Sequence, residues 1–364
     1  MSDKVRVVDL FCGVGGLSYG FYHNKNFDIV LANDIDKDAI QAYQYNHPNV
    51  KVFQCDIKHI DIKMIGKDIK LPIDVVVGGP PCQSYSTLGK RSNDDRANLF
   101  KEYIRLINIL EPKIFIYENV TGLVSMLGGT LFQDLTDSMV DLGYSVDYKI
   151  LNTVQYGIPQ IRERVIVVGT KIKTKFVFPN RTHGNKPLKP YITMRDALSD
   201  LPILQSGEES DEYDNIPQND YQQFLRQNNP KLTEHQSPNN GKHLIKLMQY
   251  LPDGGTKDDL PQDLRPKSGY KNTYAKLWWD RPVPTVTRNF SCVSSSRCIH
   301  PRDSRALTTR EGARLQSFPD DFQFCGSRSK KNLQIGNAVP PLLSIQLAKQ
   351  VLRYLKESEN NKDV

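Results

Sequence analysis

From residue 5 to residue 170 the chain repeats one pattern, in which a short apolar run is followed by an amphipathic stretch. The apolar runs are VRVVDL, FDIVLA, IDVVVGG, KIFIYE and RVIVVGT, and each is hydrophobic on consecutive residues, as strands buried on both faces are. The stretches between them carry apolar residues at the spacing of an amphipathic helix. This alternation predicts an α/β fold with a doubly wound parallel sheet.

The composition changes near residue 178, where the rhythm stops and Pro, Asn, Gly and Ser become frequent. A chain of 364 residues is longer than one hydrophobic core usually serves, so we expect two domains. The late segment PPLLSIQLAKQVLRYLKE is strongly amphipathic and suits a helix that covers a sheet. We therefore expect residues 1–178, completed by 332–364, to form the first domain, and residues 179–331 to form a smaller, irregular or β-rich domain with the hinge.

Composition excludes several classes of protein. No apolar run reaches membrane-spanning length, and the N-terminal MSDKVRVVDLFCG has none of the features of a secretory signal. We therefore expect an intracellular, cytoplasmic protein with no membrane partner. The six cysteines include no C-x-x-C pair, so neither a disulfide framework nor a metal site is expected.

The formal net charge of +7 is unevenly placed along the chain. Residues 265–331 contain fourteen Lys or Arg against five Asp or Glu, interleaved with Tyr and Trp. Cations next to aromatic rings are what neutralising phosphates and contacting bases requires, so this segment is a candidate nucleic-acid surface. Judged by charge alone, an ordinary solvated face is the favoured interpretation.

A glycine-rich turn follows the first predicted strand, in DLFCGVGG. Its glycines allow a tight turn and leave room for a ligand at the end of the strand. Asp34 and Asp56 end the next two strands, where they could accept hydrogen bonds from a ribose and from an adenine amine. Because Ser18 replaces the last glycine of G-x-G-x-x-G, a nucleoside ligand without a pyrophosphate is preferred, although a purely structural turn remains an alternative.

Cys82 follows a predicted strand and two prolines, in VVVGGPPCQSYS. Most intracellular cysteines are small buried hydrophobes, but the end of a strand at the ligand edge of the sheet suits a nucleophilic thiolate. Glu118 ends the next strand, where burial would raise its pKa toward that of a general acid. Arg162 and Arg164 lie on one face by period-two spacing and could hold Glu118 or a polar substrate, or be surface charges.

The ordered motifs DLFCGVGG, GGPPCQSYS, ENV, QIRER, REGARLQSFPDDF and QIGNAVP resemble those of the DNA cytosine-5 methyltransferases that act in bacterial restriction–modification systems. The resemblance covers nearly the whole chain, except about residues 180–300, where the family carries its variable target-recognition region. It implies a Rossmann-like S-adenosylmethionine-dependent methyltransferase domain at 1–178 and 332–364, and a target-recognition domain at 179–331.

The family's functional residues carry over onto matching positions of this chain. Cys82 would be the nucleophile, Glu118 would contact the target base, and Arg162 and Arg164 would complete the base pocket. The S-adenosyl-L-methionine pocket would be formed by Phe11, Gly13, Gly15, Gly16, Asp34, Ile35, Asp56, Ile57, Pro81, Leu99, Asn337 and Ala338. Candidate DNA contacts are Ser86, Arg281, Arg288 and Arg297. At position 34 many members have Glu, so the shorter side chain of Asp34 places hydrogen bonding to both ribose hydroxyls slightly in doubt.

The implied reaction adds the Cys82 thiolate to carbon 6 of a cytosine flipped out of the duplex, so that carbon 5 can take the methyl group. The expected partner is double-stranded DNA, bound by a monomer, with a restriction endonuclease as a possible companion not needed for activity. An RNA (tRNA) cytosine-5 methyltransferase, a dehydrogenase and an inactive DNA-binding homologue are the alternatives. The missing glycine argues against the dehydrogenase, and the presence of Cys82 and Glu118 argues against the inactive homologue.

Overall fold

The computed structural model describes residues 4–69, 71–81, 99–172, 175–227, 231–267, 269–270 and 272–360. The chain divides into two compact units. Unit 1 comprises Met1–Asn152, Glu163–Asn180 and Leu343–Val364, and unit 2 comprises Thr153–Arg162 and Arg181–Leu342. Compared with the expected domains, unit 2 additionally takes in Thr153–Arg162 and the stretch from residue 332 to Leu342.

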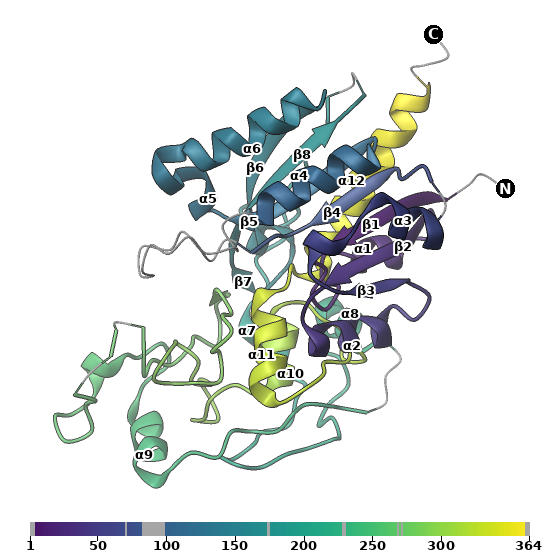
Figure 1. Cartoon of the computed structure of the whole chain (residues 1–364). Helices are drawn as coiled ribbons and strands as arrows, with labels where there is room; N and C mark the ends of the chain where they lie inside the picture. Colours follow the sequence, from purple (N-terminus) through teal and green to yellow (C-terminus); the bar gives the residue numbers. More distant parts are fainter. Residues whose placement is uncertain are drawn as a thin grey trace. The chain divides into compact units, whose positions relative to one another are not determined.

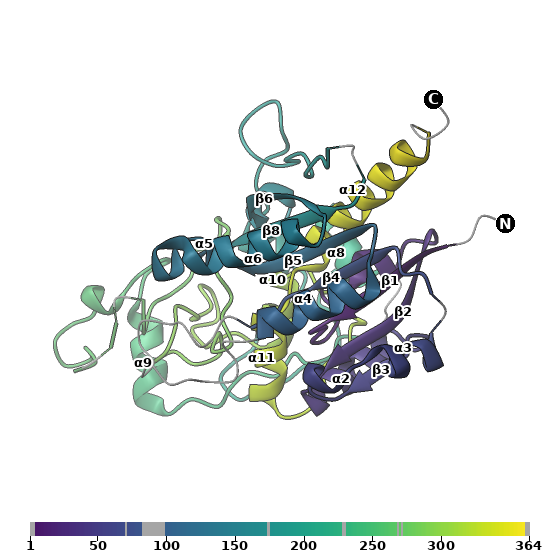
Figure 2. The same cartoon turned by 45° about the horizontal axis from the view of Figure 1, so that its top comes forward.

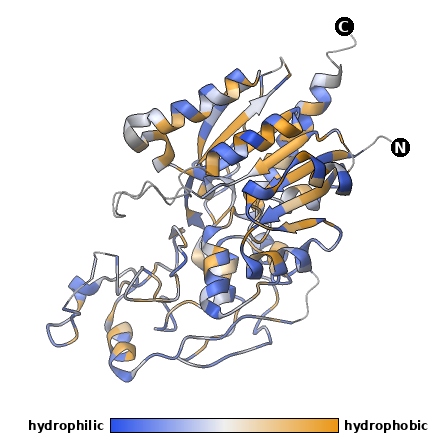
Figure 3. Ribbon diagram, in the orientation of Figure 1, coloured by the Kyte–Doolittle hydropathy of each residue, from blue (hydrophilic) through white to orange (hydrophobic). Residues whose placement is uncertain are grey.

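Unit 1 is built on a seven-stranded sheet in the order β3-β2-β1-β4-β5-β8-β6. Its strands are β1 (Val5–Leu10), β2 (Phe27–Asp34), β3 (Val52–Gln54), β4 (Val75–Gly78), β5 (Ile114–Val120), β6 (Ser145–Asn152) and β8 (Glu163–Thr170). Strands β1 to β5 pair in parallel. The central strands are the most hydrophobic ribbons of the unit, as Figure 3 shows, which is why the apolar runs were visible in the sequence.

The expectation of an all-parallel sheet is wrong at one edge. Strand β8 runs antiparallel to both β5 and β6. A parallel return from β6 to β8 would need a long crossover connection, whereas only residues 153–162 separate the two strands. Strand β6 was not predicted, because it is an edge strand in which half of the residues are exposed and which forms no apolar run.

Helices cover both faces of this sheet (Figures 1 and 2). They are α1 (Tyr19–Tyr22), α2 (Lys37–Asn46), α3 (Ile62–Asp68), α4 (Leu99–Leu110), α5 (Gly122–Ser125), α6 (Thr130–Asp141) and α12 (Pro341–Asn360), with short 3-10 turns at Ile57–His59 and Met126–Gly129. A hydrophobic core joins Val8 and Phe115 of the sheet to Leu106 of α4 and Leu135 of α6. The fold class expected from the sequence, a Rossmann-like α/β unit, is confirmed.

Helix α12 returns to unit 1 from the far end of the chain. The Ser344 hydroxyl accepts a hydrogen bond from the backbone N–H of Gly20 at 2.8 Å and donates one to the carbonyl of Leu17. A Cβ on Gly20 would lie 2.4 Å from backbone atoms of Ser344 and Ile345, so this close approach requires glycine. These contacts tie α12 to the segment that follows the glycine-rich turn.

Unit 2 is irregular, with short helices and little sheet. Its elements are a 3-10 turn at Thr153–Tyr156, β7 (Gln160–Ile161), α7 (Met194–Leu198), α8 (Asp220–Arg226), α9 (Lys242–Tyr250), a 3-10 turn at Lys257–Asp259, β9 (Val283–Pro284), α10 (Thr309–Leu315) and α11 (Arg328–Asn337). Strands β7 and β9 pair in parallel.

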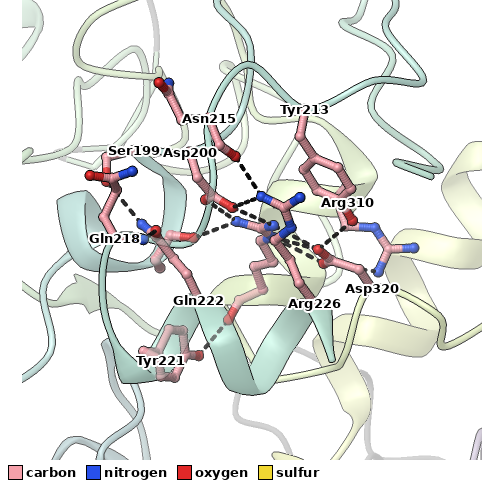
Figure 4. A network of polar contacts seen from close by, with 12 residues as sticks. Ser199, Asp200, Tyr213, Asn215, Gln218, Tyr221, Gln222, Arg226, Arg310 and Asp320 are labelled. Atoms are coloured by element: carbon pink, nitrogen blue, oxygen red, sulfur yellow. Dashed lines mark hydrogen bonds and ion pairs between the residues drawn. The ribbon is translucent and has the colours of Figure 1, made fainter. Parts of the chain in front are cut away.

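A buried network of ion pairs holds unit 2 together (Figure 4). The Arg314 guanidinium donates to Asp320 Oδ2 at 2.6 Å and to Asp200 Oδ1 at 2.5 Å, and all three side chains are fully buried. Tyr213 donates its hydroxyl proton to Asp320 at 2.9 Å, and Arg226 lies over the Tyr213 ring. The network joins residues far apart in the sequence, which compensates for the small amount of regular structure.

None of the helices that the structure describes combines the length and the apolar character needed to cross a bilayer.

Candidate active site

The glycine-rich turn lies directly after β1, and its backbone conformation explains its composition. Gly13 and Gly15 have φ of 53° and 91°, and Phe11 also has a positive φ of 57°. A Cβ on Gly15 would lie 2.3 Å from Cε1 of the buried His47 ring, so no larger residue fits there. Burial lowers the pKa of His47 to about 3, so this ring supports the turn as a neutral group. A residue such as Phe11, held in a sparsely populated conformation, is typical of a functional site.

Asp34 at the end of β2 is bound to this turn. Its Oδ2 accepts a hydrogen bond from the Gly13 N–H and its Oδ1 accepts one from the Asp36 N–H, both at 2.9 Å. Burial raises the pKa of Asp34, and these backbone donors oppose the rise. Ile35 follows it with its side chain 67% exposed, an apolar surface beside a fixed carboxylate. Such a pair of neighbouring side chains suits the ribose and the base of a nucleoside.

Asp56 follows β3, the next strand toward the edge of the sheet. Its Oδ1 accepts a hydrogen bond from the Lys58 N–H at 3.0 Å, and Ile57 beside it is buried. The Asn33 amide donates to the carbonyls of Phe53 and Cys55, which fixes the end of the strand. The residues predicted to bind the cofactor in this half of the sheet therefore lie at three successive strand ends, as a nucleoside site in an open α/β sheet requires. This donor and acceptor set fits the nucleoside part of S-adenosylmethionine.

Glu118 and Arg164 form an ion pair on neighbouring strands. Arg164 Nε lies 3.0 Å from Glu118 Oε1, and both side chains are largely buried. Arg164 pairs with Val120 in the antiparallel register of β5 and β8, which brings the guanidinium alongside the carboxylate. Sequence spacing placed Arg164 within reach of Glu118, and the structure joins the two side chains directly.

The chain leading to Cys82 is held by the same strand end. The Asn119 amide donates to the Pro80 carbonyl at 2.9 Å, and a Cβ on Gly79 would lie 2.9 Å from Glu118 Oε2. Gly79 thus leaves the space that the Glu118 carboxylate occupies, and Asn119 fixes the backbone two residues before the cysteine. Cys82 and Ser86 themselves lie outside the described residues.

Pro81 and Leu99 flank that stretch. Pro81 is exposed, and Leu99 begins α4 and packs against the hydrophobic core of unit 1. The predictions that these residues close around the cofactor stay predictions.

Gly79 and Asn119 were not singled out from the sequence. The doubled glycine before the prolines and the asparagine after Glu118 were the available signals, but neither residue type reveals its contact partner. Their roles depend on the pairing of β4 with β5, in which Gly78 lies beside Tyr117.

Three residues predicted to form the base and cofactor pockets belong to unit 2. The Arg162 guanidinium is buried and donates to the carbonyls of Val286, Gly336 and Ala338 at 3.2, 2.9 and 3.3 Å. These three acceptors are backbone carbonyls of unit 2, which is the geometry of a residue that fixes neighbouring segments. Asn337 is the last residue of α11 and is exposed, and Ala338 caps the same helix.

The predicted DNA-contacting arginines differ in their surroundings. Arg281 and Arg288 are exposed, and the Arg281 guanidinium lies 5.9 Å from the centre of the Trp278 ring. Arg297 lies over the same ring at 4.2 Å, and it donates to the carbonyls of Gly254 and Lys276 at 2.9 and 2.5 Å. Arg297 is thus engaged in holding its own unit together.

The basic segment between residues 265 and 331 is less exposed than its charge suggested. Arg305, Arg310 and Arg314 are fully buried and bind acidic side chains or carbonyls. The reading of this whole segment as a surface stripe is therefore wrong for these three residues.

A buried cluster of His300, Asp303 and Glu311 has the composition of a metal site. Arg305 lies among these side chains and donates to Asp303 Oδ2 and Glu311 Oε1, both at 2.7 Å. Burial alone would raise the pKa of Glu311, but Arg305 holds it well below its ordinary value. The guanidinium thus supplies the positive charge that these carboxylates need, so the donor set fits an ion-pair cluster.

Comparisons with known proteins give one consistent result. The family model for C-5 cytosine-specific DNA methylases matches residues 5–353. The Type II methyltransferase M1.HphI of Haemophilus parahaemolyticus is 34% identical over 355 residues, which cover 96% of this chain and 87% of that protein. The Type II methyltransferase M.AgeI of Thalassovita gelatinovora is 32% identical, with coverage of 95% and 99%. A solved structure of a candidate DNA modification methyltransferase encoded within an Escherichia coli prophage is 28% identical, with a TM-score of 0.79 and coverage of 97% and 100%.

Proposed function

The chain belongs to the C-5 cytosine-specific DNA methylase family, and from that premise we propose how its residues carry out the family's reaction at a specific duplex site. It is an enzyme that transfers a methyl group from S-adenosylmethionine to carbon 5 of cytosine in DNA. Its relatives named above are Type II methyltransferases, and we assign this chain the same role, protection of DNA in a restriction–modification system.

The observation that carries the proposal is the Glu118–Arg164 ion pair. It lies against Gly79, at the strand end that leads through Pro80 to the nucleophile Cys82. The acid and the cation of this pair can bind the polar edge of a pyrimidine ring, and we propose that the Cys82 thiol attacks carbon 6 of that ring. A dehydrogenase has no use for that set of groups.

S-adenosylmethionine, when bound, supplies a methyl group on a positively charged sulfur, ready to be transferred to a nucleophile. Asp34 would accept hydrogen bonds from the ribose and Asp56 from the adenine amine, while the backbone from Phe11 to Gly16 would line the pocket with Ile35 and Ile57. Pro81, Leu99, Asn337 and Ala338 complete our proposed set. The fixed position of Asp34 between two backbone donors is the feature that orients the ligand.

Cytosine is a weak carbon nucleophile, and the proposed chemistry overcomes this in two stages. The Cys82 thiolate forms a bond to carbon 6, and the electron pair of the 5,6 double bond becomes available at carbon 5. Carbon 5 would then take the methyl group as the bond between that group and the donor sulfur breaks, leaving the donor as a neutral thioether. A base then removes the proton on carbon 5, and the bond between sulfur and carbon 6 breaks to restore the double bond. Both stages need the base outside the stacked duplex.

Glu118 and Arg164 stabilise the charge that moves through the ring. Once it has taken up a proton, Glu118 donates to ring nitrogen 3, where negative charge develops when the thiolate adds, and Arg164 binds the exocyclic oxygen on the neighbouring carbon 2. We propose that Arg162 supports this pocket through the segments it binds, because its guanidinium is committed to the carbonyls of Val286, Gly336 and Ala338.

The partner is double-stranded DNA, and we propose that one copy of the chain acts alone and needs no endonuclease for activity. Unit 2 would carry target recognition, with Arg281 and Arg288 as contacts and Arg297 as a residue that keeps the Trp278 region in shape, and Ser86 of unit 1 would be a further DNA contact. We further propose that the protein works in association with the bacterial nucleoid.

Transfer of tritium from labelled methyl donor tests the function. Label should enter cytosine of duplex DNA and leave RNA unlabelled. The RNA alternative is not favoured, because the family and the relatives are DNA methylases or Type II methyltransferases. Label in RNA alone would restore that alternative, and label in neither would contradict the proposed function.

A further inference from the structure

The turn from Thr287 to Phe290 in unit 2 presents one exposed cation on a backbone that is anchored at both ends. The Phe290 N–H donates to the Thr287 carbonyl at 3.2 Å, which closes the turn. Val286 before it and Phe290 at its end are buried, whereas Arg288 within it is exposed. The turn is therefore an exposed tip between two buried apolar anchors.

Two buried side chains of the β7 segment fix the first anchor. Gln160 Oε1 accepts a hydrogen bond from the Val286 N–H at 2.8 Å, and Arg162 Nη1 donates to the Val286 carbonyl at 3.2 Å. Gln160 is itself held, because its amide donates to Gln316 Oε1 at 2.9 Å. The backbone N–H and the carbonyl of Val286 are thus both bound by side chains that are almost fully buried.

Close packing fixes the rest of the turn. A Cβ on Gly336 of α11 would lie 2.4 Å from the backbone nitrogen of Arg288, and a Cβ on Gly312 of α10 would lie 2.2 Å from the Phe290 ring. Both glycines therefore allow a helix to touch the turn directly. The backbone around Arg288 has little freedom to shift.

The Arg288 side chain contrasts with this firmly held backbone. Among the residues that the structure describes, its guanidinium has no hydrogen bond, ion pair or aromatic contact. By contrast, the Arg297 guanidinium donates hydrogen bonds to two backbone carbonyls, and the Arg281 guanidinium lies near the Trp278 ring. As far as the described part of the chain shows, all the donors of Arg288 are thus available, and its backbone is held on both sides.

We propose that Arg288 reads a guanine of the target site, by donating two hydrogen bonds from its guanidinium to O6 and N7 in the major groove. The inference rests on the proposed function, since it needs duplex DNA as the substrate. Base readout depends on a fixed geometry, whereas a phosphate accepts a cation over a wide range of positions, so a rigid mount suits a base contact. Gln160 and Arg162 are then positioning residues, which act through the Val286 backbone.

The test compares four variants with the wild type in a host that lacks cytosine methylation. Bisulfite sequencing of host DNA gives the methylated site, and binding of duplex oligonucleotides at several salt concentrations gives the number of phosphate contacts. Arg288→Ala should relax one G·C position, with about a ten- to hundred-fold loss of discrimination there. Arg288→Lys keeps the charge but lacks the planar fork, so it should relax the same position with an unchanged salt slope.

Two arginines serve as comparisons. Arg281→Ala should weaken binding equally for all sequences and lower the salt slope by about one, as loss of a phosphate contact does. Arg353→Ala on α12 removes an exposed cation paired with Glu357 and should leave site and affinity unchanged.

The outcomes separate the inference from the proposed function. If Arg288→Ala keeps the wild-type site, or weakens binding equally for all sequences, the inference is wrong and the methyltransferase activity stands. If the wild type itself leaves no 5-methylcytosine in host DNA, the proposed function fails and the inference fails with it.

Discussion

Replacing Arg314 by Met removes the cation that binds both Asp200 and Asp320 in the buried network of unit 2. The change keeps an unbranched side chain but leaves Asp200 and Asp320, both fully buried, without the guanidinium that binds them at 2.5 and 2.6 Å. Removing one partner of a buried ion pair typically costs about 3–5 kcal/mol. Arg226 and Arg310 lie 3.6 and 3.8 Å from the same two carboxylates and compensate in part, so we expect the low end of the range, about 3 kcal/mol.

The assay uses the two tryptophans of the chain, Trp278 and Trp279, both of which lie in unit 2. Their fluorescence therefore reports the unfolding of that unit. At about 2–4 °C per kcal/mol for a unit of this size, Arg314→Met should lower the midpoint by roughly 6–12 °C. Arg353→Met, at an exposed pair on α12, should leave it unchanged. A loss below about 1 kcal/mol for Arg314→Met would refute the view that this network holds unit 2 together.

The pH dependence of the stability of the same variant provides a second test of the network. Burial alone would raise the pKa of Asp320, but Arg314 holds it below its ordinary value. Stability from such a carboxylate is present above its unfolded pKa, about 4, and is lost as pH falls through the lower folded pKa. The wild type should therefore lose tryptophan-monitored stability below about pH 4, and Arg314→Met should show a weaker loss over the same interval.

Three further predictions concern unit 1. Cys82→Ser should abolish methyl transfer, measured with labelled donor, and leave cofactor binding intact in calorimetry, because a hydroxyl is a far weaker nucleophile; near-normal turnover would contradict the mechanism. Gly79→Ala should reduce kcat about ten- to hundred-fold in steady-state kinetics, because its Cβ would lie 2.9 Å from Glu118 Oε2; an unchanged kcat would show that this carboxylate is free to move. Burial raises the pKa of Asp9 to about 8, so its contribution to stability should fall as pH rises from about 4 to about 8. Asp9→Asn should remove that slope from urea unfolding curves, and an unaltered slope would mean that Asp9 is ionised.

Much of unit 1 could be predicted because its strands are buried on both faces and therefore appear as continuous apolar runs. The residues at the strand ends followed from topology, since the carboxyl ends of parallel strands share one edge of the sheet. Edge strand β6 was missed because exposed positions leave no apolar signal. The direction of β8 depends on the length of the connection before it, which apolar patterning does not report.

Unit 2 was harder to predict, because its stability depends on ion pairs between residues that are far apart in the sequence. Arg314 looks like a surface cation in the sequence, and one of its partners, Asp200, lies 114 positions away. The same limit applies to the site. Glu118 and Arg164 could be named as candidates from the sequence. The space that Gly79 leaves for Glu118, and the hydrogen bond from the Asn119 amide to the Pro80 carbonyl, follow only from the pairing of strands.

The central claim is that Cys82 attacks a flipped cytosine, and trapping of the covalent adduct tests it most directly. A duplex is prepared with 5-fluorocytosine at the position that bisulfite sequencing identifies, because fluorine on carbon 5 cannot leave as a proton does and the adduct persists. With the methyl donor present, we predict a species that survives denaturation, has the mass of protein plus methylated DNA, and maps to Cys82 after digestion. No stable adduct with the wild-type protein, or an adduct on another residue, would contradict the account.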